Sequence, residues 1–235
     1  ETAKKPFGII TESYRPWCID VVLLSYIANS LYVKKNNKLT LDPENFKNPI
    51  KKEDLDFFAK VCNNFVEKHE ILNSKQYFTN EEREHYKNVL LLWVTSFKTS
   101  ETITIQSVWE KIITSKGSWD NYGLAMMYYM ELQTSGLLEL CKVYNDQNNF
   151  MTKYINHLKS IILSNPATRI TPLDSLKEMR NIFSSIKKED YNKLIEKYKV
   201  LITNKETLTN MEKKRDDNVM NQLEEKKRLI KLKNN

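Results

Sequence analysis

Glycine is scarce in this chain, with four residues among 235. At an average usage of about 7%, roughly sixteen would be expected. Folds built from many tight turns, such as propellers and jelly rolls, need far more glycine. The glycine-rich loops that hold nucleotide phosphates, GxxxxGK[ST] and GxGxxG, are absent as well. The sequence therefore excludes a turn-rich β fold, and we expect no nucleotide-binding loop within these residues.

Metal-binding and disulfide patterns are also lacking. The three cysteines, Cys18, Cys62 and Cys141, lie far apart and form no CxxC pair, so neither a zinc site nor a disulfide framework is indicated. The three histidines do not stand at metal-ligand spacing with each other or with a cysteine. We therefore expect no metal, no cofactor and no catalytic residue in this chain, and reduced thiols in an intracellular, cytoplasmic protein.

Long apolar runs and clustered positive charge are missing too. The most apolar run, residues 19–33, covers about fifteen residues and includes Asp20, whereas a membrane-spanning helix needs about 20. Lys and Arg number 37 against 30 Asp and Glu, for a net charge of +7. The acids interleave with the bases, while a nucleic-acid binder gathers its bases on one face. We expect neither a membrane span nor a nucleic-acid partner.

Apolar residues are present in a pattern that predicts an all-α, multi-helix bundle. They make up 40% of the chain, enough to bury a core at this length. Most of them recur every three or four residues, the spacing of helices with one buried face. The expected helices cover residues 19–31, 54–66, 79–97, 108–116, 118–135, 137–144, 151–163, 172–183 and 190–198.

Several local signals refine this prediction. Thr79 and Glu82 have the spacing of a capping box at a helix start. Residues 34–50, with two prolines, are expected to form a loop with at most a short helical turn. Residues 101–105 alternate Thr and Ile; they suit either a strand or, as we favour, the approach to the next helix. Residues 118–135 are apolar almost all round, which predicts the central buried helix.

Two segments match short motifs in the right order. WDNYGLA (residues 119–125) opens the apolar helix, and NPATRITP (165–172) follows, with its Arg169 49 residues after Asp120. Together they resemble the C-terminal lobe of eukaryotic-type protein kinases, which has Asp-x-Trp/Tyr-x-Leu-Gly at the start of its F helix and Pro-x-x-Arg-x-Thr before its last helix. ESYRPW (12–17) is loosely similar to the end of that family's activation segment, and PFG (6–8) to a degenerate Asp-Phe-Gly.

The resemblance implies structural roles for residues at the start of the apolar helix. In the family, the Asp at this position accepts backbone N–H bonds from the catalytic loop, a charge-assisted anchor. Asp120 takes that role here, with Trp119 and Tyr122 completing the motif. The alternative interpretation of Asp120 is an ordinary N-cap.

The resemblance also implies a buried ion pair for Arg169. In the family, the corresponding Arg pairs with the Glu that closes the activation segment. Trp17 stands where that Glu is expected, which leaves Asp20 or Glu12 as the partner. The alternative is that Arg169 is a surface charge.

The family's catalytic parts are absent from this chain. It lacks the His-Arg-Asp catalytic loop, the Asp-Phe-Gly metal ligand, the glycine-rich loop and the strand-borne Lys, without which Mg-ATP is not held. A helical insertion of about a hundred residues precedes Trp119. Such insertions, together with 31 Lys, 6 Arg and 24 Asn, resemble the divergent kinase-like proteins of giant DNA viruses.

We expect two parts in the chain. Residues 1–204 form a helical domain, of which 118–183 are kinase-like. Residues 205–235 form a charged helical tail with nine basic and six acidic side chains. Its broken apolar stripe, Met220, Leu223 and Ile230, either docks onto a protein partner or belongs to an exposed, frayed helix.

Three functions remain open at this point. The favoured one is a kinase-like, pseudokinase-type structural and interaction module that binds proteins, with a virion component as one form of it. The second is the C-terminal part of an active serine/threonine kinase whose catalytic motifs lie upstream of residue 1. The third is an unrelated helical scaffold subunit of a large assembly.

Overall fold

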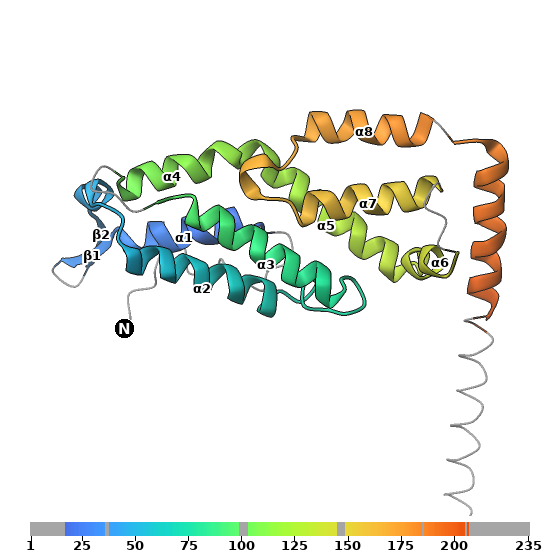
Figure 1. Cartoon of the computed structure of the whole chain (residues 1–235), viewed down its shortest axis with the longest axis horizontal. Coiled ribbons are helices and arrows are strands. Elements are labelled where there is room, and N and C mark those ends of the chain that lie inside the picture. The colour runs from blue at the N-terminus through green and yellow to red at the C-terminus, as the bar shows by residue number, and fades with distance from the viewer. Residues whose placement is uncertain are drawn as a thin grey trace, which may run out of the picture.

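The structure is a computed structural model that describes residues 17–35, 38–98, 103–144, 149–184, 186–204 and 206. This part of the chain is mainly helical (Figure 1), which confirms the all-α class. Residues 188–204 are helical as well. The other α-helices are α1 (Ile19–Ser30), α2 (Lys52–Lys68), α3 (Asn80–Thr95), α4 (Ile105–Ile113), α5 (Trp119–Thr134), α6 (Leu137–Tyr144), α7 (Phe150–Ile162) and α8 (Pro172–Ser184).

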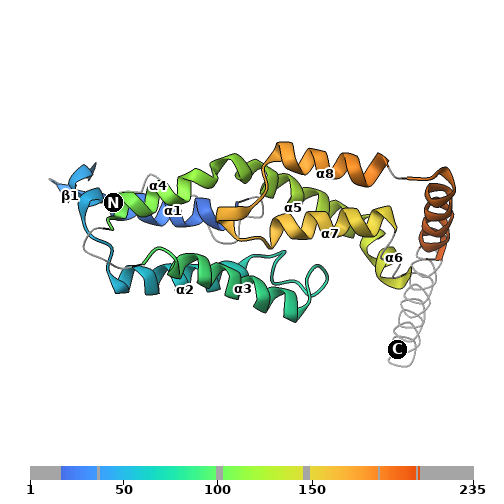
Figure 2. The same ribbon diagram turned by 45° about the horizontal axis from the view of Figure 1, so that its top comes forward.

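The helices form two neighbouring groups that share one apolar core. α1, α2 and α3 make up the first group, and α5, α7 and α8 the second (Figures 1 and 2). α4 lies along α1 and joins α5 through a short 3₁₀ turn, η2 (Thr114–Ser118). A single cluster of buried apolar side chains runs through both groups. Residues 118–183 and the described residues before them therefore share one core.

The buried helix of this fold is α1 and not α5. Nine of the twelve α1 residues are buried, from Ile19 to Ala28. In α5, by contrast, Leu124, Met127 and Tyr128 are exposed by 48%, 60% and 52%. The prediction that α5 is enclosed on all sides was wrong. An apolar sequence marks a helix that could be enclosed, but only the tertiary packing decides which sides are covered.

Residues 32–41 also differ from the prediction. They form an antiparallel hairpin, β1 (Tyr32–Lys35) with β2 (Lys38–Leu41), in which Tyr32 pairs with Leu41. We expected a loop because these residues lack the apolar alternation and the glycine-containing turn of a hairpin. The expected helical turn does follow, as η1 (Pro43–Lys47).

The helix starts follow the capping signals closely. The Thr79 hydroxyl accepts the Glu82 backbone N–H at 3.2 Å, and the Glu82 carboxylate accepts the Thr79 N–H at 2.8 Å, so the capping box is confirmed. Asp54 caps α2 from the third helical position, since its carboxylate accepts the Lys51 N–H at 2.8 Å. Thr104 forms one isolated bridge with Pro49 and caps α4. The described residues of this segment therefore lead into the helix, as favoured, and do not form a strand.

Gly136 ends α5 with a left-handed backbone, at φ +80°. A side chain there would strain the backbone, and Leu201 Cδ2 would lie 3.5 Å from its Cβ. The same region receives the helix of residues 188–204, because the Tyr198 hydroxyl donates to the Ser135 carbonyl oxygen at 2.9 Å. This helix stands across the end of the molecule, beside α6 (Figures 1 and 2).

Candidate functional site

A buried ion pair joins Arg169, in the turn before α8, to the beginning of α1. Arg169 Nη1 lies 3.1 Å from Asp20 Oδ2, although the two residues are 149 positions apart. Neither side chain has any exposed surface. Asp20 is thus the partner of Arg169, and Glu12, the other candidate, lies outside the described residues. The burial of Arg169 excludes its interpretation as a surface charge.

The second carboxylate oxygen of Asp20 is held by Ser115 of η2, the 3₁₀ turn between α4 and α5. Ser115 Oγ lies 2.5 Å from Asp20 Oδ1 and 2.6 Å from the Ile112 carbonyl oxygen. Its single proton goes to the carboxylate, which is the stronger acceptor. The Trp119 indole N–H donates to Ser115 Oγ at 3.3 Å. Trp119, Ser115, Asp20 and Arg169 therefore form one continuous polar chain.

The start of α5 also holds the Arg169 segment in place. The guanidinium carbon of Arg169 lies 5.0 Å from the centre of the Tyr122 ring, a cation–π contact worth about 2 kcal/mol when desolvated. One residue earlier, Asn121 Nδ2 donates to the Ile170 carbonyl oxygen at 2.9 Å. The predicted structural residues Trp119, Tyr122 and Arg169 thus come together at one point of the fold.

The ionisable groups around this pair stay neutral at pH 7. Burial, followed by the negative charge of Asp20, raises the pKa of Cys18 to about 12. Burial raises the pKa of Tyr86 and of Tyr122 well above their usual range. Burial thus keeps the Cys18 thiol and the Tyr86 and Tyr122 phenols protonated beside the pair, so none of these three groups is an activated nucleophile.

Asp120 does not join this network. It lies exposed in the first turn of α5, and Ser118 precedes the helix as the N-cap residue. Within the described part of the chain, its carboxylate makes no hydrogen bond or ion pair. Asp120 is therefore not the N-cap, because it lies two residues after the N-cap residue Ser118. The role of Asp120 as an anchor for a catalytic loop stays a prediction.

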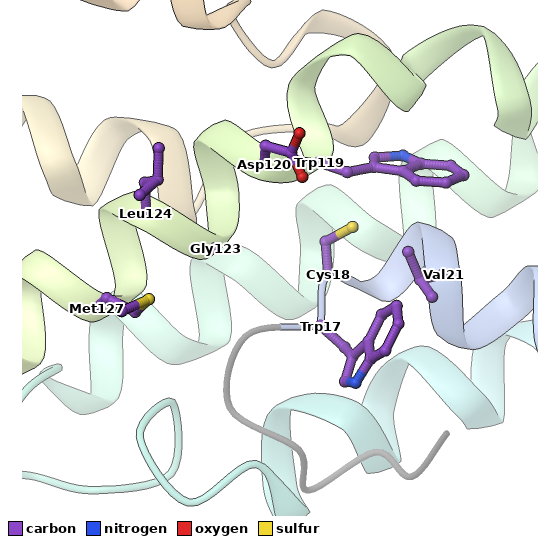
Figure 3. Close-up of a pocket in the computed structure, with 8 residues that line it drawn as sticks. All are labelled: Trp17, Cys18, Val21, Trp119, Asp120, Gly123, Leu124 and Met127. Carbon is purple, nitrogen blue, oxygen red and sulfur yellow. The ribbon is translucent and has the colours of Figure 1, made fainter. Parts of the chain in front are cut away.

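Asp120 instead faces an apolar groove of about 620 Å³ between α5 and the residues that enter α1 (Figure 3). Asp120 is the charged residue among eight that line it. The others are Trp17, Cys18 and Val21 on one side, and Trp119, Gly123, Leu124 and Met127 on the other. The exposed Leu124 and Met127 side chains of α5 therefore border a hollow and not a flat face.

Other predicted features lie elsewhere. Met220, Leu223 and Ile230, the predicted partner-binding residues, are outside the described residues. In the part of the chain that is described, no group of three or more His, Cys, Asp and Glu side chains is arranged to hold a metal ion. No helix there combines the length and the apolar character that crossing a membrane requires.

The roles of Ser115 and Asn121 had no counterpart in the sequence patterns. Both are common polar residues within helix-end segments, and each acts on a partner at least 49 positions away. Asp20 could have been singled out from the sequence, because it is an acidic residue within a largely apolar run. A charge in such a place needs a buried partner, and Arg169 supplies it.

Comparisons with known proteins identify no relative. No protein-family model matches the chain, and neither a curated protein nor a solved structure does.

Proposed function

We propose that this chain is a structural and interaction module related to the C-terminal lobe of protein kinases. The observation that carries the proposal is the buried Arg169–Asp20 pair stacked on Tyr122. The kinase resemblance implied a buried acidic partner for this arginine, at the end of the segment that precedes α1. Helical periodicity alone implies no such contact. The arrangement therefore supports the relationship beyond the all-α class.

The Asp20–Arg169 pair supports a structural role because it connects elements that lie far apart in the sequence. Asp20 belongs to α1, Tyr122 to α5, and Arg169 to the turn between α7 and α8. Breaking a buried pair leaves one uncompensated charge inside the protein, at a cost of about 3–5 kcal/mol. The pair therefore favours one arrangement of these three elements over others.

The interaction role is supported by an apolar stripe on α8. Leu173, Leu176 and Phe183 are exposed, and their spacing of three and seven residues places them on one side of the helix. Tyr191, Val200 and Ile202 of the neighbouring helix are exposed as well. Exposed apolar patches of this kind mark protein-binding surfaces. We define Leu173, Leu176 and Phe183 as the α8 stripe and propose that it binds a protein partner.

A second candidate is the C-terminal portion of an active serine/threonine kinase. Asp120 favours it, because its exposed carboxylate at the start of α5 is free to accept N–H bonds from a catalytic loop encoded upstream. The two candidates differ in ATP binding. A saturable rise in the melting temperature of the intact protein with Mg-ATP supports the kinase, and an unchanged melting temperature supports the module.

The interaction role is tested by cross-linking mass spectrometry in cells that produce the protein. Replacing Leu173 and Leu176 by Ser is expected to remove specific cross-links from α8 while the melting temperature stays within a few degrees. Phe183 is kept, because its ring packs against Tyr154 and Phe150 of α7, with ring centres 5.4 Å and 6.3 Å away. The matched control is Leu92→Ser on α3, where the side chain is 70% exposed. Unchanged cross-links in the α8 variant would contradict the proposed surface.

A further inference from the structure

The groove between α5 and the residues that enter α1 has the size and the lining of a small-molecule site. Its volume of about 620 Å³ falls within the roughly 300–1,000 Å³ of ligand pockets. Apart from Asp120, the lining consists of aliphatic, aromatic and sulfur-containing side chains and one glycine (Figure 3). Ligand pockets are lined in the same way, by apolar and aromatic groups with a few polar groups that orient the ligand.

One side of α5 forms the longer wall of this groove. Asp120, Gly123, Leu124 and Met127 lie on that side, at offsets of three, four and seven residues from Asp120. Glycine is unfavourable inside a helix, and here its missing side chain adds to the hollow between Asp120 and Met127. Leu124 and Met127 are exposed, so an apolar ligand that covered them would remove apolar surface from water.

Asp120 decides which charge the groove favours. It is exposed, and it is the charged residue among the eight that line the groove. The N-terminus of α5 contributes only about half a positive charge, which offsets part of the full negative charge of the carboxylate. The indole rings of Trp17 and Trp119 add to the preference, because tryptophan is the aromatic side chain that attracts cations best. Charge complementarity therefore favours a cation.

The extent and the construction of the groove favour a small molecule over a protein. Eight residues line it, whereas an interface between separate proteins uses about 20–30 residues on each side. Two of its walls are fixed by the fold: Cys18 and Val21 are buried, and the Trp119 indole N–H donates to Ser115 Oγ at 3.3 Å. Small-molecule sites are usually preformed in this way.

We infer that this groove binds a small organic cation, an ammonium group on an apolar body. The ammonium group pairs with Asp120, and the apolar body covers Leu124 and Met127. The inference is independent of the kinase relationship and of the α8 stripe.

A methyl-group NMR titration of the full chain tests the inference. The methionine methyl groups are isotope-labelled, and the probes are phenylbutylamine, which is protonated at pH 7, and the uncharged phenylbutanol. The amine is expected to shift the Met127 signal saturably and to move the signal of its buried neighbour Met126 far less. The amine is also expected to bind about two- to fivefold more tightly than the alcohol, as for an exposed ion pair.

Three variants separate the charge from the apolar wall. Asp120→Asn is expected to weaken binding of the amine about two- to fivefold and to leave binding of the alcohol unchanged. The matched control is Glu131→Gln, because Glu131 is an exposed acid on the same helix that does not line the groove; both affinities should stay the same. Leu124→Ser should weaken both probes alike, since it removes part of the apolar wall. All three side chains are exposed, so the melting temperatures should stay close to that of the parent chain.

The inference is overturned if no saturable shift occurs at Met127, or if the amine and the alcohol bind the parent chain equally tightly. Equal losses of amine affinity in Asp120→Asn and Glu131→Gln would overturn it as well, because they would reflect net charge and not a contact at Asp120. A Met127 signal that moves with protein concentration and not with the amine would assign the groove to a second copy of the chain and would contradict the proposed ligand.

Discussion

α1 and α5 are both rich in apolar residues, yet the fold uses them in opposite ways. α1 contains an aspartate and is buried on nearly all sides, while α5 leaves three large apolar side chains exposed. The charge in α1 is tolerated because Arg169 and Ser115 satisfy both carboxylate oxygens of Asp20. Enclosure of a helix therefore depends on its neighbours and on whether its polar groups find partners, more than on how many apolar residues it contains.

The largest effect on stability is expected from removing the positive charge of Arg169, which pairs with Asp20 of α1. Arg169→Met leaves the Asp20 carboxylate buried without its partner, and the free energy of unfolding should fall by about 3–5 kcal/mol. Urea unfolding followed by circular dichroism measures this change. The control is Lys177→Met, which breaks the exposed pair with Asp174 and should cost less than about 1 kcal/mol. An equal fall in the free energy of unfolding of the two variants would show that the buried Asp20–Arg169 pair contributes no more to stability than an exposed pair.

Two adjacent methionines of α5 test its division into a buried and an exposed side. Met126 has no exposed surface, whereas Met127 is 60% exposed. Met126→Ala should lower the free energy of unfolding by about 2–5 kcal/mol, because it opens a cavity in the core. Met127→Ala should change it by no more than about 0.5 kcal/mol. Similar losses at the two positions would mean that α5 is enclosed on both sides.

The end of α5 provides a smaller test with glycines. Gly136→Ala forces an L-residue to φ +80°, which should cost about 1–2 kcal/mol. Gly117→Ala serves as the matched control, because nothing lies within 4 Å of the added Cβ; it should be neutral or stabilising by up to about 1 kcal/mol. Thermal unfolding of both variants measures the difference. Equal effects would contradict the left-handed conformation at Gly136.

The smallest effect concerns His157 on α7, which lies 2.9 Å from the Ser175 hydroxyl on α8. Burial lowers the pKa of His157, although Glu178 opposes this. The unfolded chain then binds the proton at higher pH than the folded chain, so stability is lost as the pH falls below about 6.5. His157→Gln should flatten the dependence of the melting temperature on pH between about 7 and 5. An equally steep dependence in the variant would assign the effect to other groups.

Local signals predicted most helices well, because helix starts and ends are written in neighbouring residues. The capping box at Thr79 and the stop at Gly136 are examples. The hairpin at residues 32–41 was missed, since its pairing does not depend on an apolar alternation. The exposed side of α5 was missed for a different reason: periodicity reports which residues are apolar and does not report which neighbours cover them.

The candidate site was predictable only where a resemblance supplied the long-range contact. Arg169 was singled out by its motif, and Asp20 was one of two candidate partners. Nothing in the sequence around Ser115 indicates that its hydroxyl reaches Asp20, 95 positions away. Contacts of this kind depend on the packing of α1 against α4, which no local pattern encodes.

The central claim is that Asp20 and Arg169 stabilise the fold as a pair, and a double-mutant cycle tests it most directly. The free energies of unfolding of Asp20→Asn, Arg169→Met and the double variant are compared with that of the parent chain. Because each single change leaves the other group buried without its partner, the double variant should be more stable than the sum predicts, by about 2–3 kcal/mol. Additive losses, with a coupling below about 0.5 kcal/mol, would contradict the claim.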